Sequence, residues 1–271
     1  MLYYPMVLVH DPFVPTPKNK DWEINRSNYQ SNPKYFSEMM EYMDMLVGRL
    51  INKLKEEDLF GNTLVVFTSD NGTKRDIVSY MKDGSEIRGG KGLTTDGGTR
   101  VPLIVSFGKR QTDPFISHDL VDFTDFFPTF AEVLGVQIHQ EWDIDGISFL
   151  PQITGRKSMP RKWVFCHYDS FFRGPDKPSK DARRFIRDHR YKLYSTGEFY
   201  DIENDHLENN NILLGSGDKQ AEKKRSFLKK ELAKFPQWKV GDITSKVMVY
   251  PGLESVRRIW NTEDNESFPT S

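Results

Sequence analysis

Two short apolar runs, each joined to a polar or glycine-rich loop, constrain the fold of this chain most strongly. Thr63–Phe67 (TLVVF) leads into the polar residues 68–72 (TSDNG), and the loop Gly89–Pro102 (GGKGLTTDGGTRVP) leads into the apolar run Val101–Phe107 (VPLIVSF). Short apolar runs bounded by turn residues indicate buried strands. In open α/β sheets the chemistry usually lies just beyond the strand ends. The pattern therefore predicts an α/β fold with a site formed by these two loops.

Asp70 and Asn71 directly follow the first of these strands and are candidate metal ligands. A carboxylate and a neutral amide oxygen form the mixture of donors that Ca²⁺ or Mg²⁺ prefers. The same residues with Gly72 also make a common turn, because Asn and Gly tolerate positive φ, so both interpretations stay open. Two residues cannot complete a shell of about six to eight oxygens. The other ligands must come from elsewhere.

Lys91 lies between glycines, as in phosphate-binding loops, but the spacing excludes a Walker loop. That motif needs Gly, four residues, Gly, Lys and then Ser or Thr. Gly84 and Gly89 have the required separation, but Gly90 occupies the lysine position, and a glycine instead of a hydroxyl residue follows Lys91. The glycines instead allow close backbone approach. They leave Lys91 to place a point charge on a substrate oxyanion; an ordinary exposed loop lysine is the alternative.

His10 ends the apolar run Met6–His10 (MVLVH), which reads as a short buried strand. Asp11–Pro17 (DPFVPTP) then stops the strand, because its three prolines prevent continued pairing or a helix. A histidine at a strand end is suited to general acid catalysis or to hydrogen bonding an anion, since its pKa lies near neutrality. Taken alone, His10 fits better as a histidine that merely donates to a nearby carbonyl.

Taken together, these segments resemble the sulfatase family of the alkaline-phosphatase-like superfamily. The resemblance covers nearly the whole chain, in collinear order. The matching segments are Pro5–Pro17, the helix from Tyr35 with the strand and loop up to Gly72, Gly89–Pro102, Asp122–Phe130 (DFTDFFPTF) and Glu198–Asn211 (EFYDIENDHLENNN). Each match is weak alone, but five in the family's order make the resemblance specific.

The resemblance implies hydrolysis of a sulfate ester on a sulfated small molecule or sugar. It implies that Asp70 and Asn71 bind a divalent cation, Ca²⁺ or else Mg²⁺. Lys91 would hold a sulfate oxygen, and His10 would contact or protonate the leaving oxygen. By the same resemblance, the region around His167 and Arg173 would reach over the pocket as substrate contacts, although a surface loop is the alternative there. Stabilisation of developing charge by preplaced cations usually contributes most to catalysis in such sites.

The chain departs from the family in lacking the Cys-x-Pro-Ser-Arg segment whose cysteine is oxidised to formylglycine. Its one cysteine, Cys166, lies in an apolar run and reads as a small buried hydrophobe. The family's early metal ligands are missing as well. We therefore interpret the chain as the carboxyl-terminal half of a sulfatase, inactive without its amino-terminal half as partner. A non-catalytic remnant that binds a cation or anion, and a related phosphonate or phosphate monoester hydrolase, are the alternatives.

The charge balance excludes a general electrostatic attraction to nucleic acid, because 38 basic residues face 39 acidic ones. No run approaches the roughly 18 apolar residues of a membrane span, and the first ten residues do not form a signal peptide. The chain itself leaves its localisation undetermined. The resemblance implies a periplasmic, secreted or lysosomal protein.

The predicted organisation has three parts. Residues 1–144 form part of an alkaline-phosphatase-like α/β domain, a mixed or parallel sheet flanked by helices, including one that starts at Asn32-Pro33. Its residues 73–88 are polar and read as a loop. Residues 145–250 form a small antiparallel subdomain with a helix, because several short strands follow one another with tight connections. Residues 251–271 form an irregular tail.

Overall fold

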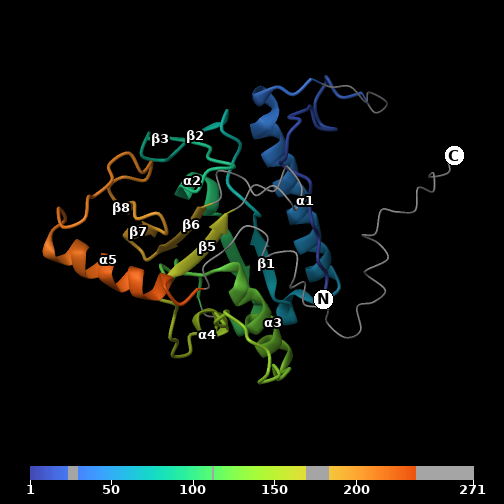
Figure 1. The fold of residues 1–271 in the computed structure, drawn as a ribbon. Coiled ribbons are helices and arrows are strands. Elements are labelled where there is room, and N and C mark those ends of the chain that lie inside the picture. The colour runs from blue at the N-terminus through green and yellow to red at the C-terminus, as the bar shows by residue number, and fades with distance from the viewer. Residues whose placement is uncertain (24–29, 112, 169–182, 236–271) are drawn as a thin grey trace, which may run out of the picture.

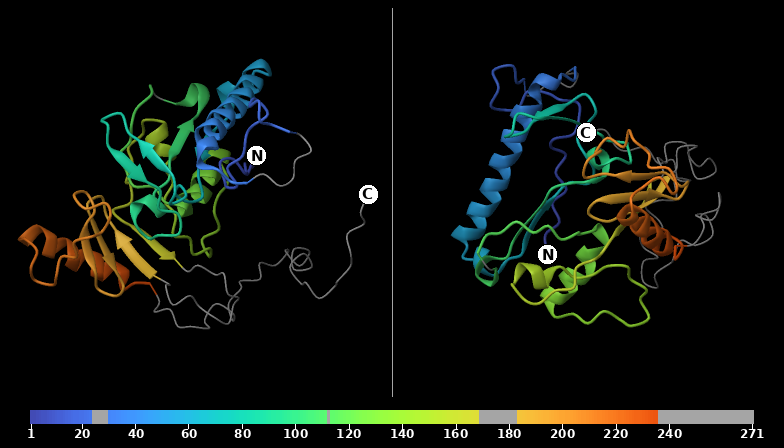
Figure 2. Two further views of the ribbon diagram at one scale, coloured as in Figure 1. Left: turned by 90° about the horizontal axis from the view of Figure 1, so that it is seen from above. Right: turned by 90° about the vertical axis from the view of Figure 1, so that its left-hand side faces the viewer.

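The computed structural model describes residues 1–23, 30–111, 113–168 and 183–235. They form a mixed α/β structure with a long helix at one side and a helix-backed antiparallel sheet at the other (Figures 1 and 2). The helices are α1 (Phe36–Glu56), α2 (Asp96–Thr99), α3 (Phe126–Leu134), α4 (Leu150–Ile153) and α5 (Lys219–Leu232). The strands are β1 (Val65–Thr68), β2 (Val78–Tyr80), β3 (Glu86–Arg88), β4 (Leu103–Ser106), β5 (Val164–Tyr168), β6 (Arg183–Arg187), β7 (Tyr191–Tyr194) and β8 (Phe199–Asp201). Within these ranges, no helix has the length and apolar character needed to cross a membrane.

The long helix α1 forms where the sequence predicts it. The Asn32 side chain caps a short 3₁₀ turn that begins at Pro33 and runs into the helix, which confirms the predicted start. The apolar stripe of α1 reaches the core through Met39, which is buried in one cluster with Phe13 and Ile77. This cluster holds the amino-terminal segment and the segment after β1 against the same helix.

The two central strands pair in the opposite sense to a parallel sheet. β1 and β4 are antiparallel, with Val65 opposite Ser106 and Thr68 opposite Leu103. The prediction of a mixed or parallel sheet is therefore wrong for the part of the chain that the structure describes, where every strand pair is antiparallel. An apolar run indicates burial but carries no information on strand direction. Because of this pairing, the end of β1 lies beside the start of β4, and the loops attached there share one edge.

Two segments near β1 also differ from the sequence-based expectation. Met6–His10 forms no strand, and the Val7 side chain in it is 81% exposed, because none of the described strands lies beside it to pair with. Residues 73–88 contain the antiparallel hairpin β2–β3 instead of an irregular loop. Asp83-Gly84 forms the tip of this hairpin, and Gly84 takes the positive φ of 82° that such turns require.

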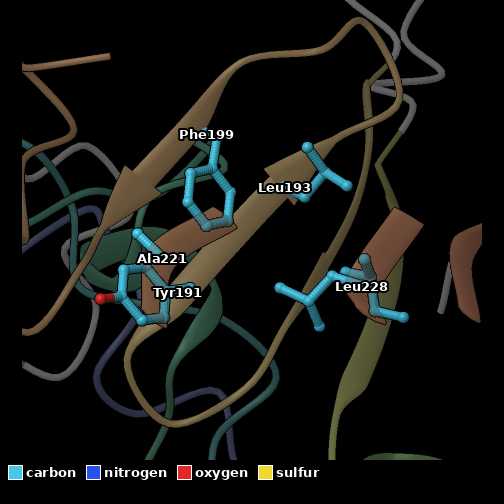
Figure 3. Packing of buried hydrophobic residues seen from close by; sticks show 6 residues of the cluster. Tyr191, Leu193, Phe199, Ala221 and Leu228 are labelled. Atoms are coloured by element: carbon cyan, nitrogen blue, oxygen red, sulfur yellow. The ribbon is translucent and has the colours of Figure 1, made fainter. Parts of the chain in front are cut away.

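The carboxyl-terminal sheet confirms the predicted antiparallel subdomain. Its strand order is β5-β6-β7-β8, with every neighbouring pair antiparallel. Helix α5 covers one face of the sheet, and its Leu228 is fully buried in one cluster with Leu193 and Phe199 of the strands (Figure 3). Complete burial of a side chain of this size contributes about 1.5–3 kcal/mol. This core gives the subdomain a rigid surface toward the rest of the molecule.

A third apolar cluster lies between β4 and the start of the carboxyl-terminal region. Phe107, which follows β4, packs with Phe149, Leu150 and Ile153 around α4. Residues just after position 145 thus contribute to the core beside β4. The boundary between 144 and 145 stays a prediction, and the predicted tail 251–271 lies outside the described residues.

Candidate functional site

Two loops, residues 69–74 after β1 and residues 89–99 before β4, are joined by backbone hydrogen bonds. Gly72 N donates to Gly98 O at 3.0 Å, and Lys91 N donates to Thr73 O at 2.9 Å. The structure therefore brings Lys91 to the loop that carries Asp70 and Asn71. The antiparallel pairing of β1 with β4 places both loops at one edge.

Glycines make this contact possible because the two backbones touch directly. A Cβ atom added to Gly72 would lie 1.9 Å from Gly97 O, and one added to Gly89 would lie 2.1 Å from Lys74 O. Within the second loop, a Cβ on Gly98 would lie 2.1 Å from Leu93 O. Any side chain at these positions would push the loops apart. The prediction that the glycines serve close backbone approach is confirmed.

Lys91 is half-buried, and its backbone is held on both sides. Besides the bond from its own N–H, its carbonyl accepts from Arg75 Nε at 2.9 Å, and Arg75 Nη2 donates to Gly92 O at 3.1 Å. Among the residues that the structure describes, no carboxylate forms an ion pair with the Lys91 ammonium group. These bonds hold the main chain of Lys91 in the loop.

His10 approaches the same site through its neighbour Asp11. Lys74 Nζ lies 3.3 Å from Asp11 Oδ2, and this hydrogen bond is the main cause that lowers the pKa of the Asp11 carboxyl, while nearby positive charge from His10 and Lys91 adds to it. His10 and Lys91 thus both lie close to Asp11. His10 Nδ1 donates to the Asp11 carbonyl at 2.6 Å, and its side chain is 55% exposed.

The acid–amide pair supplies two oxygen donors at this edge. Asp70 is exposed and Asn71 is half-buried, and Ser69 Oγ donates to the Asn71 carbonyl at 2.9 Å. Hard oxygen donors of this kind fit Ca²⁺ or Mg²⁺. Within residues 1–23, 30–111, 113–168 and 183–235, no three His, Cys, Asp or Glu side chains gather as a metal site. The pair therefore fits such a metal as part of a larger shell of oxygen ligands.

Of the two predicted substrate contacts, His167 and Arg173, the structure describes only His167. His167 lies on β5, and its Nδ1 accepts from Arg184 Nε at 2.8 Å across the strand pair. Burial lowers the pKa of Arg184. Tyr168, the next residue on β5, places its hydroxyl beside Gly92, 3.6 Å from where a Cβ on that glycine would be, so this strand ends near the Lys91 loop. Arg173 lies outside the described residues.

Several residues that contact the Lys91 loop are missed by sequence reasoning. Arg75 and Lys74 fall in a segment read as a polar loop, and Lys192 on β7 gives no signal apart from being a lysine inside an apolar strand. The hairpin itself has a signal in Asp83-Gly84, a turn pair between two short runs. Cys166 is only partly buried, so its interpretation as a buried hydrophobe is met in part; burial raises the pKa of its thiol to about 11.

Comparison with protein families gives two matches that overlap in the Lys91 loop. The sequence model of the Sulfatase family matches residues 2–136, and the model described as N-sulphoglucosamine sulphohydrolase, C-terminal, matches residues 90–237. Arylsulfatase A of Bos taurus is 32% identical over 132 residues, which are 49% of this chain and 26% of that protein. Steryl-sulfatase of Homo sapiens is 30% identical over 144 residues, 49% of this chain and 24% of that protein. The chain thus matches about a quarter of the length of these relatives.

Solved structures match over a larger share of the chain. A structure described as a complex with its substrate D-glucosamine-2-N,6-O-disulfate is 27% identical, has a TM-score of 0.55 and covers 74% of this chain and 39% of that chain. A structure from Bacteroides thetaiotaomicron, described under metabolism of multiple glycosaminoglycans, has a TM-score of 0.61 at 20% identity and covers 84% and 48%; it shares the fold.

The second family match alone covers more than half of the chain, and the relatives and the fold agree with it. The sequence motifs occur in the family's order, the two glycine-containing loops contact each other, and the family models match. The chain belongs to the sulfatase family.

Proposed function

We propose that this chain forms the carboxyl-terminal part of a sulfuric ester hydrolase site. In this proposal Asp70 and Asn71 are two of the oxygen ligands of a divalent cation, Lys91 binds a sulfate oxygen, and His10 contacts the leaving oxygen. The observation that carries the proposal is the hydrogen bond from Lys91 N to Thr73 O at 2.9 Å, together with the Gly72–Gly98 bond. These bonds hold the candidate anion-binding lysine beside the candidate metal ligands.

The chemistry requires positive charge at two places. Cleavage of a sulfate ester builds negative charge on the leaving oxygen while the sulfuryl oxygens stay charged, and preplaced cations stabilise both. In this proposal Lys91 supplies one ammonium group, and His10 supplies an imidazole that contacts the leaving oxygen. A bound Ca²⁺ would supply Lewis-acid stabilisation of the sulfuryl oxygens.

The nucleophile is the part that this chain does not supply. No segment of the sequence matches Cys-x-Pro-Ser-Arg, and the partly buried Cys166 has a thiol pKa raised to about 11, which disfavours the reactive thiolate. We therefore propose that the chain alone binds but does not turn over a sulfate ester. The relative solved with a disulfated glucosamine supports a sulfated sugar as the substrate class.

Calorimetric titration of the 271-residue chain with CaCl₂ and with sodium sulfate tests the proposal. With only part of a ligand shell, we expect Ca²⁺ affinity in the weak range of about 10⁻⁴–10⁻³ M. Asp70→Ala should abolish this binding, whereas Asp83→Ala, which removes an equal charge from the exposed hairpin tip, should leave it unchanged. In the same way, Lys91→Met should weaken sulfate binding, and Lys82→Met on the hairpin should not.

Two results would contradict this assignment. The first is a failure of the unchanged chain to bind Ca²⁺ or sulfate. The second is Ca²⁺ binding that survives in Asp70→Ala, or sulfate binding that survives in Lys91→Met. Turnover of an aryl sulfate by the purified chain would refute our account of the nucleophile. If the chain binds phosphate or phosphonate esters more tightly than sulfate, the result would favour the related monoester hydrolase.

A further inference from the structure

We propose that Lys192 on β7, together with Glu208 and Tyr194, positions Lys91 by fixing the loop that carries it. This inference rests on the proposed role of Lys91 as the sulfate-binding cation. It assigns a task to the carboxyl-terminal sheet, which contributes no candidate charge of its own to the sulfate but contacts the loop through buried polar side chains.

Lys192 is an unusual residue for its place. Its side chain is completely buried in a strand whose four residues are all buried. The ammonium group donates to the Thr94 carbonyl and to Glu208 Oε1, the latter at 2.7 Å, and it lies 3.9 Å from the centroid of the Phe185 ring. Thr94 follows Lys91 closely in the same loop, so a buried charge of the carboxyl-terminal sheet is used to hold the main chain of this loop.

Tyr194 completes the network from the same strand. Its hydroxyl lies 2.9 Å from Thr94 Oγ1 and 2.5 Å from Glu208 Oε2. Both oxygens of Glu208 are thus occupied, one by Lys192 and one by Tyr194. Thr94 is held at its carbonyl and at its hydroxyl by two residues of β7.

A second attachment lies slightly further along the loop. Arg187 Nη1, on β6, lies 2.7 Å from both carboxylate oxygens of Asp96, the first residue of α2. The loop is therefore tied to two adjacent strands of one sheet. On its other side it is tied to Thr73 and Arg75. Lys91 lies between these two sets of contacts.

Burying a lysine would be costly without these partners. Burial lowers the pKa of Lys192, and the charge and hydrogen bond of Glu208 oppose that effect. Replacing a buried pair by apolar residues of similar volume is often neutral for stability, so the fold alone does not demand an ion pair here. What the pair adds is a directed bond to Thr94, which an apolar side chain cannot make.

Hydrogen–deuterium exchange on the 271-residue chain tests the inference without requiring catalysis. The amides of Lys91 and Leu93 are bonded to Thr73 O and Gly90 O within the loop region. In Lys192→Met we expect these amides to exchange at least about tenfold faster, because local stability is lost when a buried network is broken. The amides of β5 to β8 should also lose some protection, because Glu208 is left without its cationic partner, but by a smaller factor than the loop amides.

Lys224→Met is the matched control. Lys224 forms an ion pair of 2.6 Å with Asp188 on the same subdomain, away from the Thr94 contact. We expect this variant to destabilise the subdomain without changing exchange at Lys91. If Lys192→Met does not fold, Tyr194→Phe removes one hydroxyl from the network and should produce a smaller effect of the same kind on the loop.

A second measurement separates positioning from mere stability. Sulfate titration monitored by the NMR signal of the Lys91 side chain should show weaker binding in Lys192→Met, by at least about threefold, since misplacement of a binding group lowers its effect steeply. Lys224→Met should bind sulfate normally. The inference is overturned if Lys192→Met shows the same amide exchange in the Lys91 loop and the same sulfate affinity as the Lys224→Met control. If the parent chain fails to bind sulfate while the loop exchange changes as expected, the proposed function fails and the structural role of Lys192 stands.

Discussion

Replacing Asp125 should destabilise this chain far more than breaking a similar ion pair on its surface. Asp125 immediately precedes α3 and is 2% exposed. Its carboxylate accepts from Arg161 Nε at 2.8 Å and from the backbone amides of Asp122 at 2.8 Å and Ile147 at 2.7 Å, and it contacts Arg161 Nη2 as well. One side chain therefore accepts from Asp122 N in the turn before α3, pairs a buried guanidinium and anchors a later segment.

The expected magnitude follows from this burial. Removing one partner of a buried pair leaves an uncompensated charge and typically costs about 3–5 kcal/mol. The hydrogen bonds from Asp122 N and Ile147 N are lost in the same change. We expect about 3–5 kcal/mol for Asp125→Ala. The surface pair Arg156–Glu132 has a similar distance of 2.7 Å, but its side chains are 54% and 36% exposed, so Arg156→Ala should cost at most about 1 kcal/mol.

Urea unfolding followed by circular dichroism measures both variants. With a slope of about 2–3 kcal/mol/M, Asp125→Ala should lower the midpoint by about 1–2.5 M. The double variant Asp125→Ala/Arg161→Met should be less destabilised than the sum of the single changes, because the orphaned charge is gone. Equal costs for the Asp125 and Arg156 variants would refute the reasoning that burial sets the strength of these pairs.

Two further predictions concern the glycine loop and the acid stability of the carboxyl-terminal sheet. Gly98→Ala should destabilise the chain by more than about 1 kcal/mol, because the added Cβ would lie 2.1 Å from Leu93 O. Gly48→Ala in α1, where nothing lies within 4 Å of the added Cβ, should instead stabilise the chain by about 0.5–1 kcal/mol. Thermal melting measures both variants, and an unchanged melting temperature for Gly98→Ala would contradict the close approach of the two backbones. Burial raises the pKa of Asp188, but hydrogen bonds from Lys224 and two backbone amides outweigh it and lower the pKa overall. Its stabilisation is therefore present above the unfolded pKa of about 3.9 and lost as pH falls through the lower folded value. Asp188→Asn should then flatten the loss of melting temperature below about pH 4, and an unchanged slope would count against this linkage.

The sequence predicts elements well where a local pattern decides them. The start of α1 at Asn32-Pro33 and the antiparallel strands β5 to β8 follow from capping and turn residues, and both are present. The sequence-based prediction fails for the relative direction of β1 and β4, because strand direction depends on the path of the chain between the two strands. It also fails for Met6–His10, because an apolar run forms a strand only when a neighbouring strand pairs with it.

The candidate site divides in the same way. The sequence identifies three candidate site residues from their type and from their position beside a strand: Asp70, Asn71 and Lys91. The structure brings the loops that carry them together. Their roles stay predictions. Lys192 could not be found from the sequence, because its importance comes from a contact with Thr94, 98 positions away. Long-range partners of this kind leave no periodic trace in the chain.

The hairpin β2–β3 is fastened at its base, where Ile77 is buried and its carbonyl accepts from Gly89 N at 2.9 Å. Residues 79–88 beyond that base are exposed. The backbone bonds that join the Lys91 loop to residues 72–77 lie at or before this base. Lengthening, shortening or grafting of the outer part should therefore leave the backbone of the Lys91 loop in place, so the outer hairpin can be exchanged as a unit.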